Sequence, residues 1–298
     1  MTEPELGNLP TEARNPASER IDEVSTLEML AVMHAADREA AAAVGQVLPR
    51  IATAVDAITA RIESGGRLFY LGAGTSGRLG VLDASEIPPT YDIPPEMVQG
   101  IIAGGEEALR WSIESVEDDL ELGARDLAER GFGAGDVLVG IATSGRTPYV
   151  LGGMEHARQV GALTIGLTCV PGSPVAEAAG IAIVPETGPE VVTGSTRMKA
   201  GTATKLVLNM LSTGAMVRLG YVYGNLMVNV QPTNSKLEDR AARIIATITG
   251  VGYEEAAELL AKAESVKTAV VMQKLGVDRA EAEARLAKAH GRLKEALR

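Results

Sequence analysis

The sequence predicts an α/β protein: a doubly wound, five-stranded parallel sheet with an N-terminal helical arm and a small C-terminal helical bundle. Two observations lead to this fold. Short apolar runs alternate with helical segments between residues 67 and 185, and the flanking regions show helical patterns only. Strands that alternate with helices form a parallel sheet that helices cover on both faces. A length of 298 residues with 46% apolar residues allows one large core plus helical appendages.

The first elements are helices, followed by the strands. Residues 1–25 are polar and Pro-rich and are expected to be extended, whereas the apolar residues from Thr26 to about Ser64 recur three and four positions apart, as in helices. Five short apolar runs are the expected strands, at 67–72, 97–104, 136–142, 162–169 and 181–185.

Further helices are expected between and after the strands. They cover 118–131, 147–161 and a long stretch from Ser195 to about Leu219. Beyond residue 232 the chain is rich in Ala, Glu, Lys and Arg and predicts a small bundle, in which Asp278 caps a helix. The predicted regions are an N-terminal arm with helices (1–57), the sheet domain (58–221) and a C-terminal helical domain (222–298).

Composition narrows the class of protein. A net charge of −11 argues against a nucleic-acid partner. The single cysteine, Cys169, cannot form an internal disulfide and fits a reducing compartment. The three histidines lack the spacing of metal ligands, so no metal is expected. The acidic N-terminus is untypical of a targeting peptide, and no run of ~20 apolar residues predicts a membrane span, so we expect a cytoplasmic protein without a membrane partner.

A near-duplicated motif is the strongest internal signal. Residues 72–78 (GAGTSGR) and 140–146 (GIATSGR) both match G-x-x-T-S-G-R, and both follow an expected strand. Glycine and hydroxyl residues between a strand and a helix N-terminus are typical of an anion site, because backbone N–H groups and the helix dipole face the anion. The candidate ligands are Thr75, Ser76, Gly77, Arg78, Thr143, Ser144, Gly145 and Thr147.

The two loops match neither common nucleotide-binding motif. The GK[ST] lysine and the dinucleotide glycine spacing are both missing, so we exclude ATP and NAD and expect no cofactor. In a sheet of order 2-1-3-4-5, the flavodoxin-like order, strands 1 and 3 are neighbours and ligands bind beyond their carboxyl ends. The two loops follow these strands and are expected to face each other across one crevice. The alternative is two ordinary Gly turns that are alike by chance.

A third motif precedes the long helix. Residues 188–205 read GPEVVTGSTRMKAGTATK, and Ser195 is expected to cap the helix and leave nearby N–H groups free for an anion. Positive side chains gather at the same end. The candidate ligands here are Ser195, Thr196, Arg197 and Lys199. The alternative is a solvated, basic helix start.

Two long motifs carry a resemblance to a known family. GAGTSGRLGVLDASEIPPTY and GPEVVTGSTRMKAGTATK together resemble the N-acetylmuramic acid 6-phosphate etherases, which are sugar-isomerase-domain proteins. The second motif is also similar to one in the glucokinase regulatory proteins, which bind sugar phosphates without catalysis. The resemblance implies a phosphorylated amino sugar as substrate, a homodimer, and cleavage of its D-lactyl ether to N-acetylglucosamine 6-phosphate and D-lactate in cell-wall recycling.

The resemblance also implies roles for individual residues. Ser76 falls where the domain family uses a hydroxyl, and Ser144 and Thr147 fall on its phosphate-cradling Ser-Gly-x-Thr element. The family's essential carboxylate pair falls on Glu86, in DASEIPP, and Glu117, in SVEDD. From the residues alone, Asp83 rivals Glu86, and Asp118 is as good a candidate as Glu117.

The chemistry of ether cleavage requires an acid and a base. Removal of the C2 proton is feasible because the C1 aldehyde of the open-chain sugar holds the developing charge, and the C3 oxygen leaves better when protonated. Glu86 is expected at a helix end halted by Pro88 and Pro89, where the dipole disfavours an anion, which suits a proton donor. Glu117 is expected at a helix start, which suits a base.

Two other functions remain open from the sequence. A phosphosugar aldose–ketose isomerase would share the C2 deprotonation and the anion site but would need no acid at the C3 oxygen. A non-catalytic phosphosugar-binding regulator would need neither Glu86 nor Glu117.

Overall fold

The structure is a computed structural model that describes residues 10–113, 115–230 and 234–298. The chain divides into two compact units. The first extends up to Ser85 and from Pro95 to Ser212, and the second comprises Glu86–Pro94 and Thr213–Arg298. The predicted division after residues 57 and 221 stays a prediction.

One parallel sheet forms the centre of the first unit. Its strand order is β2-β1-β3-β4-β5, which confirms the predicted order, and neighbouring strands pair in parallel throughout. The strands lie where the apolar runs predicted them: β1 (Leu68–Gly72), β2 (Val98–Ile102), β3 (Val137–Ile141), β4 (Leu163–Leu167) and β5 (Ile181–Ile183).

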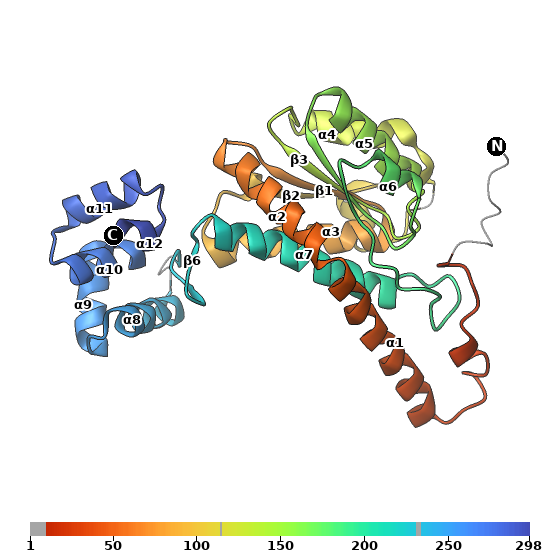
Figure 1. Cartoon of the computed structure of the whole chain (residues 1–298), viewed down its shortest axis with the longest axis horizontal. Helices are drawn as coiled ribbons and strands as arrows, with labels where there is room; N and C mark the ends of the chain where they lie inside the picture. The colour runs from red at the N-terminus through yellow and green to blue at the C-terminus, as the bar shows by residue number, and fades with distance from the viewer. Residues whose placement is uncertain (1–9, 114, 231–233) are drawn as a thin grey trace. The chain divides into compact units, whose positions relative to one another are not determined.

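Helices cover both faces of this sheet, as Figure 1 shows, with α4, α5 and α6 on one face and α2, α3 and α7 on the other. The side chains of a strand alternate between the faces. Phe69 and Leu71 pack with Leu127 and Met154 of α4 and α5, while Tyr70 between them contacts α3. The helices are α1 (Thr26–Gln46), α2 (Leu48–Glu63), α3 (Gly74–Tyr91), α4 (Leu120–Glu129), α5 (Pro148–Gln159), α6 (Pro174–Ala178) and α7 (Lys199–Arg218).

Short 3-10 helices complete the first unit and occupy several connections. They are η2 (Pro16–Ser18), η3 (Pro95–Met97), η4 (Gly105–Leu109) and η5 (Val116–Asp118). At the N-terminus, a capping box between Ser25 and Glu28 begins α1. Within the described residues, no single helix is long and apolar enough to cross a membrane; α1 and α2 meet the length and composition test only as a pair, which is bent by 61°.

The second unit holds the predicted helical bundle. Asp278 caps α11 by accepting a hydrogen bond from Glu281 N, which confirms its predicted role. A short antiparallel hairpin precedes the bundle and was not predicted. The elements are β6 (Val222–Tyr223), β7 (Leu226–Met227), α8 (Ser235–Thr249), α9 (Tyr253–Ala263), α10 (Val266–Leu275), α11 (Arg279–Lys288) and α12 (Leu293–Ala296).

A buried carboxylate fixes the start of two neighbouring strands. Asp136 accepts hydrogen bonds from the backbone N–H groups of Arg67 (2.8 Å) and Gly133 (2.9 Å), and from the Arg67 guanidinium (2.8 Å). Burial of Asp136 opposes its ionisation, but these hydrogen bonds outweigh burial and hold the pKa of the carboxyl below its usual value. The charged form of Asp136 therefore sets the register between β1 and β3.

We predict that Asp136→Asn lowers the free energy of unfolding at pH 7 by about 3 kcal/mol, because the Arg67 guanidinium loses its charged partner. A carboxyl with a lowered folded-state pKa stabilises the fold above its unfolded pKa of about 4, and this stabilisation disappears as the pH falls through the folded-state value. Denaturant unfolding at pH 7 and at acidic pH measures the difference between the variants. A difference that did not shrink in acid, or an equal loss in the exposed control Asp22→Asn, would contradict the account.

Candidate functional site

The two TSGR motifs lie side by side at the carboxyl edge of the sheet. One follows β1 and the other follows β3, and these strands pair with Gly72 opposite Ile141. This position confirms the prediction that the two loops follow neighbouring strands of the sheet. The site therefore begins with two similar sequences at one sheet edge.

The two motifs differ in backbone conformation. Thr75, Ser76, Gly77 and Arg78 form the first turn of α3, which begins at Gly74 and not near Gly77 as predicted. The helix can begin this early because Gly77 lies against the end of β1: a Cβ there would lie 2.6 Å from the Gly72 oxygen. By helix geometry, the N–H groups of Thr75 and Ser76 have no carbonyl partner one turn earlier, so they are available to an anion.

The second motif is a loop and not a helical turn. Thr143, Ser144 and Gly145 precede Thr147, which is the N-cap residue of α5 and makes no capping hydrogen bond with its side chain. The side chains of Thr143, Ser144 and Thr147 are half-buried, and Gly145 has a φ of +71°. The loop thus brings hydroxyl groups to the same edge as the first turn of α3.

The segment after β4 supports the second motif from behind. Cys169 N and Val175 N donate to the carbonyl oxygens of Thr143 and Gly145, both at 3.0 Å. A Cβ on Gly145 would lie 2.1 Å from Ser173 Oγ. Glycine is therefore required at position 145 for two reasons: its φ is left-handed, and a side chain there would collide with Ser173.

The third motif lies close to the first but begins its helix later than predicted. α7 begins at Lys199, so the expectation that Ser195 caps this helix is wrong. Ser195 and Thr196 are half-buried and Arg197 is exposed in the preceding turn. A Cβ on Gly201 in α7 would lie 3.7 Å from the Thr75 methyl carbon, which brings the start of α7 next to the first turn of α3.

Buried charges explain the late start of α7. The Glu190 carboxylate accepts hydrogen bonds from Lys199 N (3.1 Å) and Ala200 N (2.9 Å), so the protein supplies its own anion to this helix end. Burial raises the pKa of Glu190, and these two hydrogen bonds lower it in part. The Lys199 side chain is 2% exposed, and its Nζ pairs with the carboxylate of Glu39 in α1 at 2.8 Å. Sequence reasoning missed Glu190 and Glu39, because nothing in the spacing links them to the motif.

The two candidate carboxylates lie in different compact units. Glu86 is exposed and belongs to the second unit. The predicted helix end at Pro88 and Pro89, directly after Glu86, is wrong: α3 continues through both prolines to Tyr91, so Glu86 precedes the last turn. Glu117 is exposed in η5, in the first unit, three residues before α4 begins. Its rival Asp118 is exposed in the same turn.

Asp83, the rival of Glu86, is engaged in the core. It is 5% exposed, and its carboxylate accepts from Tyr70 Oη (2.9 Å) and Asn209 Nδ2 (2.6 Å). Burial, with Asp83 nearby, raises the pKa of Tyr70 well above its usual value. Asp83 thus joins β1, α3 and α7, and Glu86 is left as the exposed carboxylate of the DASE motif.

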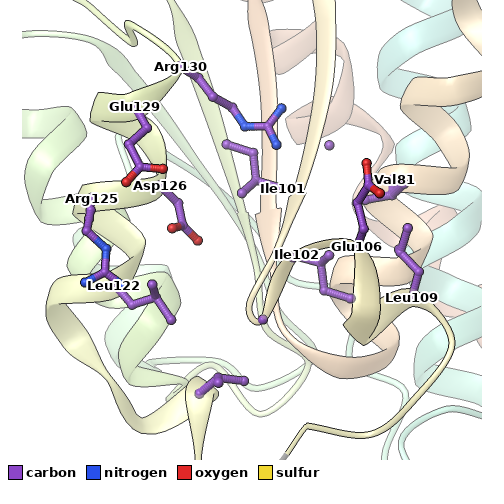
Figure 2. A pocket seen from close by; sticks show the side chains of 14 residues that line it. Val81, Ile101, Ile102, Glu106, Leu109, Leu122, Arg125, Asp126, Glu129 and Arg130 are labelled. Atoms are coloured by element: carbon purple, nitrogen blue, oxygen red, sulfur yellow. The ribbon is translucent and has the colours of Figure 1, made fainter.

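A cavity of about 600 Å³ lies beside β2, between α4 and η4. Figure 2 shows Leu122, Asp126 and Glu129 of α4 on one side and Glu106 and Leu109 on the other. No predicted site residue lines it. In the described part of the chain, no three His, Cys, Asp or Glu side chains are placed to hold a metal ion.

Comparison with known proteins first defines the class. Residues 50–158 match the family model "Glucokinase regulatory protein N-terminal SIS domain", and residues 130–214 match the SIS domain model. The fold is similar to that of phosphoheptose isomerase from Neisseria gonorrhoeae, with a TM-score of 0.51 and 18% identity over 65% of this chain and all of that one. The phosphoheptose isomerase from Francisella tularensis is similar with a TM-score of 0.50 and 20% identity, over 64% of this chain and 98% of its own. The first unit thus contains a SIS domain.

Similarity over the whole chain then defines the family. A relative from Aeromonas hydrophila is 57% identical over 96% of this chain and 97% of its own length. One from Aliivibrio fischeri is 55% identical over 98% of both. Both are named N-acetylmuramic acid 6-phosphate etherase. The chain belongs to the N-acetylmuramic acid 6-phosphate etherase family.

We predict that Gly145→Ala displaces the second TSGR loop and weakens sugar phosphate binding, because the new Cβ meets Ser173 at a strained φ. Gly172→Ala is the matched control: Gly172 has a φ of +64°, but nothing lies within 4 Å of its Cβ position. The control should lose only the conformational cost, about 1–2 kcal/mol, as measured by thermal unfolding. Calorimetric titration with N-acetylglucosamine 6-phosphate measures binding. Equal loss of affinity in both variants would refute the role of the Ser173 contact.

Proposed function

We propose that this protein cleaves the D-lactyl ether of N-acetylmuramic acid 6-phosphate to give N-acetylglucosamine 6-phosphate and D-lactate, a step in the recycling of cell-wall amino sugars. The observation that carries the proposal is the 53–57% identity to etherases over nearly the full length of both chains. The geometry of the sheet edge supports it, because an anion site is needed for a phosphosugar.

The phosphate group is proposed to bind between the two TSGR motifs. Free N–H groups in the first turn of α3, with the Ser76 hydroxyl, face the anion from one side. The hydroxyls of Ser144 and Thr147 approach from the other. Charge-assisted hydrogen bonds of this kind are about twice as strong as neutral ones, so a few of them suffice to orient the sugar.

Thr75, Thr143 and the third motif are proposed to complete the substrate site. Ser195, Thr196 and Arg197 lie in the turn before α7, whose first residues approach Thr75. The role of Lys199 as a substrate ligand stays a prediction. Its ammonium group forms an ion pair with Glu39. Arg197 is thus the exposed cation of the turn before α7.

The proposed reaction is an elimination followed by addition of water. A base removes the C2 proton of the open-chain sugar, and the electron pair forms the C2–C3 double bond as lactate leaves with a proton from an acid. Water then adds at C3, its hydroxyl taking the place of the lactyl ether and its proton returning to C2. Acid and base each contribute typically 10²–10⁴-fold.

We assign the acid to Glu86 and the base to Glu117. For Glu117 the helix argument still supports the assignment, because α4 begins three residues later and its N-terminal dipole favours an anion. For Glu86 the argument from a helix end no longer applies, since α3 continues to Tyr91. Its support is the family resemblance and its exposure, in contrast to the buried Asp83.

We further propose a homodimer in the cytoplasm. The first turns of α1 expose apolar side chains, with Leu27 78% and Leu30 52% exposed, and a second copy of the chain would cover them. A phosphorylated substrate and a free, buried Cys169 fit an internal compartment. Sedimentation equilibrium of the wild type and of a Leu27→Lys, Leu30→Lys variant tests the dimer, which the variant should weaken.

The deciding experiment is incubation of the protein with N-acetylmuramic acid 6-phosphate in H₂¹⁸O. We expect D-lactate in the medium and ¹⁸O at C3 of the sugar product. Sugar phosphate binding without lactate release would exclude the etherase and favour a regulator. A ketose product without lactate would favour an isomerase.

We predict that Glu86→Gln and Glu117→Gln each lower kcat by about 10²–10⁴-fold, because each removes one proton transfer. The exposed Glu107→Gln, in the same acid-rich region, is the control and should leave kcat within about twofold. The pH dependence of residual activity separates the roles: loss of the acid should remove the alkaline limb, and loss of the base the acidic limb. If both variants lost the same limb, the assignment of separate roles would be wrong.

A further inference from the structure

Arg78, a candidate phosphate ligand, makes contacts that suggest a different role. It lies in the first turn of α3, two residues after Ser76. Its Nε donates to the carbonyl oxygen of Leu109 and its Nη2 to that of Trp111, both at 3.2 Å. These two N–H groups form the planar edge with which a guanidinium grips a phosphate. In this structure, this edge of the Arg78 guanidinium donates to two backbone carbonyl oxygens instead.

The carbonyls that Arg78 holds belong to the acidic segment, which we define as residues 105–113 and 115–119. This segment contains η4 and η5 and carries the proposed base, Glu117. Much of it is exposed: Trp111 is 68% exposed and Leu109 36%. Its apolar contacts with the domain include the buried Ala108, Ile113 near Gly104, and Val116, which packs against the core between α4 and α5.

The cavity beside β2 leaves one side of the acidic segment unsupported. Glu106, Leu109 and Val116 line this cavity, so the segment forms one of its walls. In Figure 2, Glu106 and Leu109 stand across the open space from α4. The space beside Glu106 and Leu109 is open, so the hydrogen bonds from Arg78 to Leu109 and Trp111 are the polar contacts that tie this part of the segment to α3.

We propose that Arg78 is a positioning residue: it fastens the acidic segment, and with it Glu117, to the helical turn whose N–H groups receive the phosphate. The catalytic consequence of this contact rests on the proposed function, in which Glu117 is the base. One turn of α3 then serves both halves of the reaction, since it presents Ser76 to the phosphate and holds the base-bearing segment through Arg78. The distance between bound phosphate and base is set by this turn.

The choice of arginine is consistent with this role. Two carbonyls that are two residues apart can be held together by a planar fork, whereas an ammonium group is a single point donor. A phosphate bound through this edge would also lose its two-point contact in Arg78→Lys. The two roles are therefore separated by the kinetic constant that changes: loss of a phosphate ligand raises KM and Kd, whereas misplacement of the base lowers kcat.

The test compares Arg78→Lys and Arg78→Gln with the wild type. The matched controls are Arg125→Lys and Arg125→Gln, since Arg125 is an exposed arginine of α4 that lines the same cavity. We expect both Arg78 variants to lower kcat roughly 10- to 100-fold through misplacement of Glu117. KM and the Kd of N-acetylglucosamine 6-phosphate should change less than about threefold, and the controls should match the wild type.

Two readouts do not depend on turnover. Trp111 is the only tryptophan of the chain, so its fluorescence anisotropy reports on the acidic segment. Hydrogen exchange of peptides from residues 105–119 reports on the same segment, while exchange in the β-strands checks that each variant is folded. Both Arg78 variants should lower the anisotropy and speed exchange in this segment alone.

The opposite results would overturn the proposal. If both Arg78 variants matched the wild type in kcat, anisotropy and exchange while KM and Kd rose, Arg78 would be a direct phosphate ligand. If the wild type released no lactate, the proposed function would fail, and anisotropy and exchange alone would decide whether Arg78 holds the segment. If Arg78→Gln failed to fold, Arg78→Lys would carry the same comparison.

Discussion

The close contact between the end of β1 and the first turn of α3 is the constraint on which the site depends. A Cβ on Gly77 would lie 2.6 Å from the Gly72 oxygen, and one on Gly72 would lie 2.8 Å from Gly77 N, so both positions exclude a side chain. Because the helix begins directly on the strand, its unpaired N–H groups lie at the sheet edge beside the loop that follows β3. The same turn then directs Arg78 to the acidic segment.

Buried polar groups hold the other parts of this edge. Asp83 joins β1, α3 and α7 through Tyr70 and Asn209, and Glu190 occupies the N-terminus of α7. Charges of this kind are costly to bury unless they are fully hydrogen-bonded, and here each carboxylate has two donors. The contribution of these groups is mainly to geometry: Asp83 ties α3 and α7 to β1, and Glu190 fixes where α7 begins.

Much of the fold and part of the site could be predicted from the sequence. Apolar runs bounded by glycine define the five strands, and the repeated TSGR motif locates the switch point, because both signals are local. The start of α3 at Gly74 was not predictable, since it depends on a contact between Gly77 and the end of β1. The start of α7 at Lys199 depends on Glu190, which is nine residues away. The end of α3 was also missed, because α3 continues through two prolines, and proline usually ends a helix. Arg78 shows the same limit: its motif predicts an anion ligand, while its partners lie some 30 residues further along the chain, at Leu109 and Trp111.

A crystal structure with N-acetylglucosamine 6-phosphate bound tests the central claim most directly. That claim is that the two TSGR motifs bind one phosphate group from opposite sides. The account predicts phosphate oxygens within about 2.7–3.2 Å of the N–H groups of the first turn of α3 and of the hydroxyls of Ser144 and Thr147. It also predicts that Arg78 still holds Leu109 and Trp111. A phosphate bound in the cavity beside β2, or gripped by Arg78 with the acidic segment released, would contradict the account.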